Sequence, residues 1–220
     1  NVTIMEGAKI GKNCRIFPGA VISAIPQDLK FDGEDTTVEI GNNVTIRECV
    51  TINRGTKDKM TTKIGNNVLL MAYVHVAHDC QIGNNCILAN AVNLAGHITI
   101  DDFAIVGGMC AVHQFVKIGK HAMISGGSLV RKDVPPFTKA AREPLSYVGI
   151  NSVGMRRRGF TSEQINQVQE LYRCLYLKGH NNSAALSIME AEFSATAERD
   201  EVISFINNSS RGVMKGYFQS

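Results

Sequence analysis

The sequence predicts a mainly β protein, a parallel β-helix of hexapeptide repeats, because aliphatic residues recur at every sixth position. Neither the 3.6-residue period of an α-helix nor the two-residue period of a strand explains a repeat of six. A short fixed period indicates a solenoid, and a period of six is typical of a parallel β-helix. The unbroken series is Ile64, Leu70, Val76, Ile82, Leu88, Leu94, Ile100, Val106, Val112, Ile118, Ile124 and Val130.

A second series of small or β-branched residues lies four positions after each aliphatic residue. Because alternate residues of a strand share a face, both series are expected to point into one narrow core. Turn residues such as Gly41-Asn42-Asn43 follow the aliphatic residue, and Gly and Asn tolerate the positive φ of a tight corner. The second series is Val68, Val74, Cys80, Cys86, Val92, Ile98, Ala104, Cys110, Val116, Ala122, Ser128 and Val134.

The same phase begins near the first residue of the chain. It places Ile4, Ile10, Ile16 and Ile22, and then Ile40, Ile46 and Ile52, in the core. The breaks at residues 24–37 and 53–63 are predicted to be loops that project from the coil. Because Asn1 already lies inside a repeat, we expect further coils to precede it.

The β-helix domain is predicted to span residues 1–136. It should end at Asp133-Val134-Pro135-Pro136, since a proline pair cannot continue a hydrogen-bonded ladder. Residues 137–220 are expected to form a linker, over 137–146, and then a small helical domain from about Tyr147.

Three helices are expected in this second domain. Thr161 and Gln164 form a capping box at the start of the first helix, and Gly179 should end it. Ser183 is expected to cap the second, and residues 198–208 should form the third. The predicted buried faces comprise Ile165, Val168, Leu171, Tyr172, Leu175 and Tyr176 in the first helix and Leu186, Met189 and Phe193 in the second.

Composition narrows the function classes. The chain has 220 residues and a net charge of +3, which is too mild to indicate nucleic-acid binding but suits an anionic small molecule or an acidic partner. It contains no apolar run long enough to span a bilayer, and no secretory signal is visible. Four of six cysteines, Cys14, Cys80, Cys86 and Cys110, occupy the small inner position, which favours packing over disulfides or zinc and indicates a cytoplasmic protein.

The repeat predicts which side chains meet. One coil of three hexads contains 18 residues, so residues 18 apart stack about 4.8 Å apart along the prism. His78, Gly96 and Gln114 therefore share one column, and Asp79, His97 and Phe115 share the next. His75 lies near the same corner, so four polar groups, His75, His78, His97 and Gln114, converge on one edge.

His78 is the candidate general base, because histidine is able to accept a proton near neutral pH. Asp79 could orient it, and the open backbone N–H of Gly96 suits an oxyanion hole. Any one of these histidines alone would be interpreted as a solvated corner residue, but the column together favours a site. The run Arg156-Arg157-Arg158 is either a solvated basic turn or a diphosphate clamp.

Several longer segments resemble those of the acyl-[acyl-carrier-protein]–UDP-N-acetylglucosamine O-acyltransferases, the first enzymes of lipid A synthesis. The matching segments span nearly the whole chain and are more specific than the hexapeptide pattern. They are Gln27-Asp28-Leu29-Lys30, Val50-Thr51-Ile52-Asn53-Arg54-Gly55, His75-Val76-Ala77-His78-Asp79-Cys80, Leu94-Ala95-Gly96-His97, Gly107-Gly108-Met109-Cys110-Ala111-Val112-His113-Gln114-Phe115, Asp133-Val134-Pro135-Pro136 and Arg157-Arg158-Gly159-Phe160.

The resemblance implies a left-handed β-helix, a homotrimer, and transfer of an R-3-hydroxyacyl group from acyl carrier protein to the 3-hydroxyl of UDP-N-acetylglucosamine. No metal or other cofactor is implied beyond the carrier-bound thioester. By the same resemblance His78 is the base and Gly96 the oxyanion donor. The residues matching substrate contacts are Asp28, Lys30, His75, His97, His113, Gln114, Gly126, Asn151, Arg157 and Arg158.

Two positions depart from the family's pattern: Val153 and Pro144 stand where members can carry an acidic residue and a histidine. Three other functions stay open. They are the sister N-acyltransferase that acts later on an acylated glucosamine, a trimeric γ-type carbonic anhydrase, and a non-catalytic scaffold. The carbonic anhydrase would hold zinc between subunits on three histidines, for which His75, His78, His97 and His113 are candidates. The segments around Asp28 and Arg157 favour the O-acyltransferase.

Overall fold

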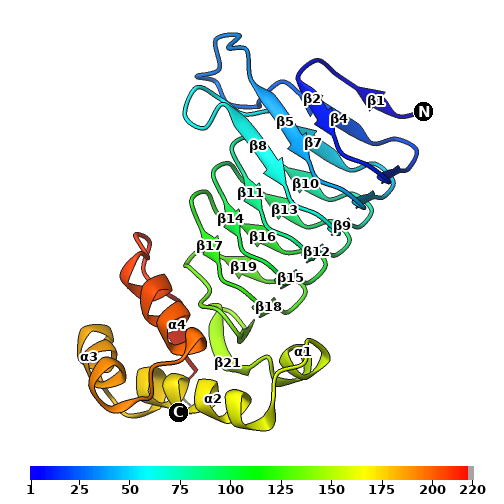
Figure 1. The fold of residues 1–220 in the computed structure, drawn as a ribbon. Helices are drawn as coiled ribbons and strands as arrows, with labels where there is room; N and C mark the ends of the chain where they lie inside the picture. Colours follow the sequence, from blue (N-terminus) through cyan, green and yellow to red (C-terminus); the bar gives the residue numbers. More distant parts are fainter. Residues whose placement is uncertain (218–220) are drawn as a thin grey trace.

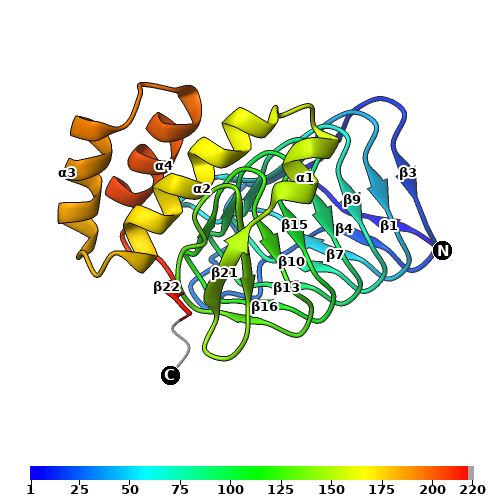
Figure 2. The same ribbon diagram turned by 90° about the horizontal axis from the view of Figure 1, so that it is seen from below.

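The chain folds as a left-handed parallel β-helix that carries a small group of helices at its C-terminal end (Figure 1). This computed structural model describes residues 1–217. Three parallel sheets form the faces of a triangular prism, and the predicted β-helix class is confirmed. Figure 2, seen from below, shows the coils stacked one behind another with α1 and α2 across the end of the prism.

Each sheet takes one strand from each coil. Sheet A consists of β1 (Thr3–Ile4), β4 (Val21–Ala24), β7 (Thr51–Asn53), β10 (His75–Val76), β13 (Asn93–Leu94), β16 (Ala111–Val112) and β19 (Leu129–Val130). Sheet B consists of β2 (Ala8–Ile10), β5 (Thr37–Ile40), β8 (Thr61–Ile64), β11 (Gln81–Ile82), β14 (Thr99–Ile100) and β17 (Lys117–Ile118).

Sheet C continues into the C-terminal part of the chain. It consists of β3 (Arg15–Ile16), β6 (Thr45–Ile46), β9 (Leu69–Leu70), β12 (Ile87–Leu88), β15 (Ile105–Val106), β18 (Met123–Ile124), β20 (Thr138–Ala141), β21 (Ser146–Ile150) and β22 (Lys215–Gly216). The register pairs Val76 with Leu94 and Leu94 with Val112, so the predicted coil of 18 residues is confirmed.

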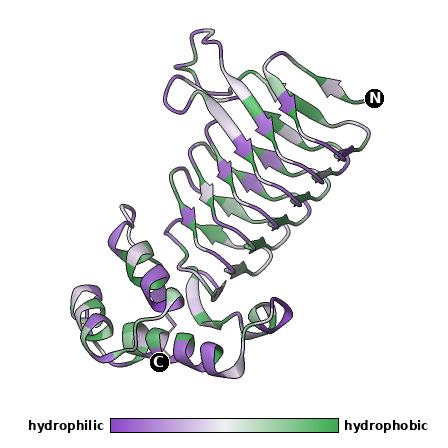
Figure 3. Ribbon diagram, viewed as in Figure 1, coloured by the Kyte–Doolittle hydropathy of each residue, from purple (hydrophilic) through white to green (hydrophobic). Residues whose placement is uncertain are grey.

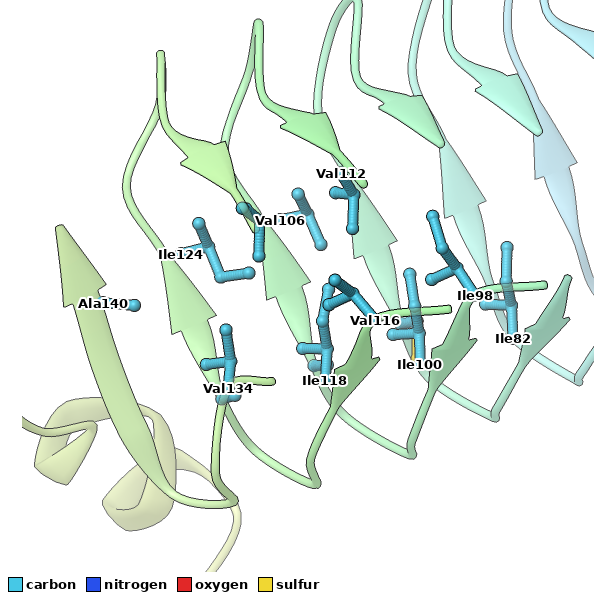
Figure 4. Packing of buried hydrophobic residues seen from close by; sticks show 14 of the residues in the cluster. Ile82, Ile98, Ile100, Val106, Val112, Val116, Ile118, Ile124, Val134 and Ala140 are labelled. Carbon is cyan, nitrogen blue, oxygen red and sulfur yellow. The ribbon is translucent and has the colours of Figure 1, made fainter. Parts of the chain in front are cut away.

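Both periodic series from Ile64 to Val134 form the core of the prism. Ile4, also predicted in the core, is instead 54% exposed, and Ile10 and Ile16 are half-buried. Ile98 and Val116 of the inner series and Ile100 and Ile118 of the aliphatic series are at most 1 % exposed, and Figure 4 shows such side chains meeting along the axis. Each fully buried aliphatic side chain stabilises the fold by ~1.5–3 kcal/mol through the hydrophobic effect. Figure 3 shows the green, hydrophobic residues alternating with polar residues along the coils.

The corners use glycine and asparagine for two different reasons. At the Gly83-Asn84-Asn85 corner the positive φ, +57°, belongs to Asn85. Gly83 is required because a Cβ there would lie 2.5 Å from the Asp102 side chain and 2.8 Å from its backbone nitrogen. The predicted positive φ at these corners is therefore confirmed for asparagine but not for glycine, which the close stacking of coils requires instead.

The predicted linker at 137–146 is also wrong. β20 pairs with β18 and β21 pairs antiparallel with β20, so the chain adds a hairpin to sheet C. Pro136 packs against Gly119 at a corner between sheets. A proline there removes no ladder hydrogen bond, and pairing resumes on the next face.

Four helices follow the hairpin: α1 (Ser152–Arg157), α2 (Ser162–Leu177), α3 (Asn182–Glu192) and α4 (Ala197–Asn207). The Thr161–Gln164 capping box is confirmed, and Gly179, at φ +74°, follows the end of α2. Asn181 rather than Ser183 caps α3, because its side chain accepts the N–H of Ala184. Phe193, predicted in the buried face of α3, is its half-buried C-cap.

None of the four helices in residues 1–217 combines the length and apolar composition that a bilayer crossing requires. Cys80, Cys86 and Cys110 are fully buried free thiols at the inner position, whereas Cys14, near the open first coil, is half-buried.

Candidate active site

The predicted base lies at the corner between sheets A and B, which we call the histidine corner: His78, Asp79, Gly96, His97, Gln114 and Phe115. Asp79 adopts a left-handed φ of +60°, as does His97 at +62° one coil later. This turn brings the Asp79 carboxylate to the same side as its neighbour, so that Oδ2 lies 2.9 Å from His78 Nδ1. Both side chains are buried.

The carboxylate of Asp79 is surrounded by donors. Oδ1 accepts the backbone N–H of Thr56 at 2.9 Å and that of Lys59 at 3.3 Å, and Oδ2 accepts the Thr56 hydroxyl at 2.6 Å. Burial alone would raise the pKa of Asp79, but the hydrogen bonds from His78 and Thr56 outweigh it and hold the pKa below its ordinary value. An ionised carboxylate only accepts, so Nδ1 of neutral His78 carries the proton and Nε2 carries the lone pair.

Gly96 lies directly against the imidazole of His78. A Cβ on Gly96 would lie 2.5 Å from Cε1 and 2.6 Å from Nε2 of that ring. The Gly96 N–H donates no hydrogen bond to any group of residues 1–217. His78 Nε2 therefore lies against the backbone of Gly96, whose N–H is unpaired within residues 1–217, so that one residue can activate a nucleophile and the other can bind an oxyanion.

His97 packs against both columns of this corner. Its ring centroid lies 5.0 Å from that of His78, edge to face, and 4.6 Å from the stacked ring of Phe115. His97 Nδ1 lies 3.1 Å from Asp58 Oδ2, but the angle is unsuited to a hydrogen bond, and this nitrogen has no hydrogen-bond partner within residues 1–217.

A cavity of about 360 Å³ opens beside His97 and Gln114. The two projecting loops supply its other walls, with Asp28 and Lys30 from the first and Asp58 from the second. The structure thus places four of the predicted substrate contacts, Asp28, Lys30, His97 and Gln114, around one cavity next to the candidate base.

His75 and His113 lie on or beside sheet A. His75 Nδ1 is 2.7 Å from the Thr51 hydroxyl, and burial, with His78 nearby, lowers the pKa of His75. It is therefore held neutral. His113 is exposed, and its Nδ1 lies 3.2 Å from the backbone oxygen of Gln114.

The remaining predicted contacts lie on other edges of the prism. Asn90, Gly108 and Gly126 stack at the corner between sheets C and A, which we call the glycine corner. A Cβ on Gly126 would approach the Gly108 carbonyl at 3.0 Å, and Gly126 itself is exposed.

Arg158 lies at the third corner, between sheets B and C, with its guanidinium 4.6 Å above the ring of Phe103. His121 stacks on the same ring at 4.8 Å, and burial, with Arg158 and Lys120 nearby, lowers the pKa of His121 to about 4. Asn151 donates to the His121 carbonyl and caps α1, while Arg157 is exposed. In a single chain the predicted residues therefore form three groups, not one.

Ligand atoms of His78, Asp79 and His97 lie within 4.8 Å of one another, which makes this trio a possible metal-binding cluster. His75 and His113 do not belong to it.

Sequence reasoning missed two residues that lie against the histidine corner, Thr56 and Asp58. Both lie in the projecting loop between β7 and β8, where the hexapeptide phase is interrupted. The interruption of the repeat indicates a loop that leaves the coil. It does not indicate which side chains of that loop contact the histidine corner.

Comparison with known proteins identifies the chain's relatives. Residues 133–214 match the family model for the second domain of UDP-N-acetylglucosamine O-acyltransferase, and residues 61–96 match the bacterial transferase hexapeptide repeat. An acyl-[acyl-carrier-protein]–UDP-N-acetylglucosamine O-acyltransferase of Chlorobaculum parvum is 51% identical over 94% of the chain and 78% of its own length. That of Myxococcus xanthus is 43% identical over 94% and 80%.

Solved structures agree with the sequence relatives. A UDP-N-acetylglucosamine acyltransferase from Bacteroides fragilis superimposes with a TM-score of 0.96 at 52% identity, covering 98% of this chain and 84% of the other. A second, from Francisella novicida, gives a TM-score of 0.90 at 35% identity, covering 97% and 92%. The chain belongs to the acyl-[acyl-carrier-protein]–UDP-N-acetylglucosamine O-acyltransferase family.

Proposed function

We propose that the chain transfers an R-3-hydroxyacyl group from acyl carrier protein to the 3-hydroxyl of UDP-N-acetylglucosamine, the first step of lipid A synthesis, with His78 as general base. The observation that carries this proposal is the buried His78–Asp79 pair, 2.9 Å apart, with Nε2 against Gly96. Membership of the family indicates the substrates, and the geometry supports the roles proposed for His78, Asp79 and Gly96.

Each step assigns a proton or an electron pair to a named group. His78 Nε2 accepts the proton of the sugar 3-hydroxyl as its oxygen attacks the thioester carbonyl, and the Gly96 N–H binds the oxyanion. When the tetrahedral intermediate collapses, the C–S bond breaks and the proton passes from His78 to the leaving thiolate. Asp79 stabilises the imidazolium between these steps.

The anionic nucleotide has two candidate binding regions. The cavity beside His97 offers Lys30 for a phosphate and Asp28 and Gln114 for sugar hydroxyls. The third corner offers Arg158 and Arg157, which can form bidentate bonds with a diphosphate. Lys30, Arg157 and Arg158 are all exposed, as diphosphate recognition requires.

Two corners of the same prism can face each other only across an interface with another copy of the chain. An acyl chain that runs from His78 to Gly126 would have to wrap around a corner, whereas a cleft between two copies presents both walls directly. Tyr73 and Met109 lie two coils apart in the column next to the glycine corner and are 65% and 76% exposed, and Leu129 of the adjoining sheet A is 39% exposed. Large exposed apolar side chains along one edge of the prism favour an interface, which supports a homotrimer with its sites between subunits.

The test of the function is an assay of purified protein with UDP-N-acetylglucosamine and a ladder of 3-hydroxyacyl carrier proteins of increasing chain length. We expect transfer to oxygen, long chains to be preferred because the open Gly126 column leaves room, and no need for an added metal or cofactor. Transfer only to an acylated glucosamine would identify the sister N-acyltransferase. Zinc-dependent hydration of carbon dioxide would identify a carbonic anhydrase, and the absence of any turnover would indicate a non-catalytic scaffold.

A cytoplasmic location completes the proposal, since the acyl carrier protein and the nucleotide sugar would have to meet there.

Arg157→Ala is expected to weaken UDP-sugar binding at least ~10-fold, because it removes a charge-assisted phosphate contact worth ~1.5–3 kcal/mol. Calorimetry with UDP measures the change. Arg156→Ala is the matched control, since Arg156 is an equally exposed neighbour in α1 but matches no contact of the family. An affinity for UDP in Arg157→Ala that equals the parental value would show that the run is only a solvated turn.

Mixed trimers test the shared cleft. Light scattering should give three times the chain mass. His78→Ala chains lack the base, and Gly126→Met chains should lack room for a long acyl group. Mixing the two should restore transfer of long chains, because some clefts then combine His78 of one chain with Gly126 of the other. A fully active monomer, or mixtures that stay inactive, would contradict the arrangement.

A further inference from the structure

One loop outside the hexapeptide coil encloses the carboxylate that orients the candidate base. Residues 54–60, which we call the clamp loop, connect β7 to β8 and carry Thr56, whose side chain is buried. Nothing in the repeat requires a polar side chain at this position. Its burial therefore needs a reason within the histidine corner.

The hydrogen bonds of Thr56 give that reason. Its backbone N–H donates to Asp79 Oδ1 at 2.9 Å, and its hydroxyl donates to Asp79 Oδ2 at 2.6 Å. The hydroxyl oxygen in turn accepts the N–H of Asp58 at 3.3 Å. Thr56 thus donates hydrogen bonds to both oxygens of the Asp79 carboxylate, and the Asp58 N–H in the same loop fixes the orientation of its hydroxyl group.

We propose that Thr56 is a positioning residue for the reaction: through Asp79 it holds His78 in the tautomer and orientation that leave Nε2 free over Gly96. This inference rests on the proposed function. The hydroxyl and His78 Nδ1 share a single oxygen, Oδ2, at 2.6 and 2.9 Å. With both donors in place this oxygen has little freedom to turn away from the imidazole.

Other groups around Asp79 cannot replace the hydroxyl. Thr62 in β8 accepts the Asp79 backbone N–H at 2.8 Å and so fixes the main chain only. Lys59 reaches Oδ1 through its backbone N–H, and its side chain is exposed. His97 Nε2 lies 3.8 Å from Oδ2, beyond hydrogen-bond distance, and Asp58 faces the other side of that ring. Thr56 is the one side chain besides His78 that hydrogen-bonds the carboxylate within residues 1–217.

The test compares Thr56→Val, which keeps the shape and removes the hydroxyl, with Thr56→Ser, which keeps the hydroxyl. Thr56→Val should lower kcat about tenfold, equivalent to ~1.4 kcal/mol in the barrier, and leave KM for the nucleotide sugar within about twofold. Thr56→Ser should stay within about threefold of the parent in both constants. The acidic limb of the kcat profile should move to higher pH in Thr56→Val, because the Asp79 carboxylate loses a donor to its charged form.

A second measurement does not depend on turnover. Nitrogen-15 NMR of the histidine side chains should find His78 with its proton on Nδ1 in the parent protein and in Thr56→Ser, and a mixture of tautomers in Thr56→Val. If the parent transfers no acyl group but this tautomer pattern holds, the proposed function fails, and only the part of the inference in which Thr56 fixes the His78 tautomer stands. Parental kcat and a parental tautomer in folded Thr56→Val would overturn the positioning role, as would equal losses in both variants with an unmoved pH profile.

Discussion

His78→Ala is expected to lower the rate of acyl transfer at least ~10²-fold, because a positioned general base contributes ~10²–10⁴-fold. The variant should keep its fold, since the side chain lies at a corner and is not part of the aliphatic core. KM for the nucleotide sugar should change little, because Nε2 acts on the hydroxyl mainly in the transition state. Initial rates with carrier-bound substrate and circular dichroism of the same preparation measure both properties.

His180→Ala is the matched control for this experiment. His180 lies in the exposed segment between α2 and α3, far along the chain from the histidine corner. Its removal should leave the rate unchanged. A folded His78→Ala protein with nearly the parental rate would remove His78 from the mechanism.

The repeat explains why so much of this corner was predictable. Parallel pairing with an 18-residue coil fixes vertical neighbours, so the contact of Gly96 with His78 and the stack of Phe115 on His97 follow from counting residues. Hydrophobic periodicity likewise identified the core, because the inner positions admit few side chains.

The parts that escaped prediction are those outside the repeat. The length of the clamp loop does not determine its path. The contact of Thr56 with Asp79 therefore could not be predicted by counting residues along the repeat. The hairpin of β20 and β21 was missed because the proline pair was interpreted as the end of all pairing, although it ends pairing on one face only. Arg158 was identified as a candidate phosphate ligand because it is an arginine. The Phe103 ring under its guanidinium, however, became evident only in the structure.

Gly96→Ala is the second change for which we expect a large effect, a loss of ~10²-fold or more in transfer rate. The added methyl group would lie 2.5–2.6 Å from two atoms of the His78 ring, closer than any real contact allows. The φ of Gly96 is not in the left-handed region, so the backbone itself accepts alanine. The imidazole must therefore move away from Asp79 or from the substrate, and a misplaced base loses most of its contribution.

The double variant Gly96→Ala with His78→Ala separates this displacement from general damage to the corner. If the methyl group acts by moving the imidazole, it costs little once the imidazole is absent, so the double variant should be about as slow as His78→Ala alone. Thermal denaturation should show that the methyl group is tolerated better in the double variant, because the empty ring position accommodates it. If the rate loss of the double variant equals the product of the two single losses, Gly96 acts independently of His78, through its own N–H at the oxyanion.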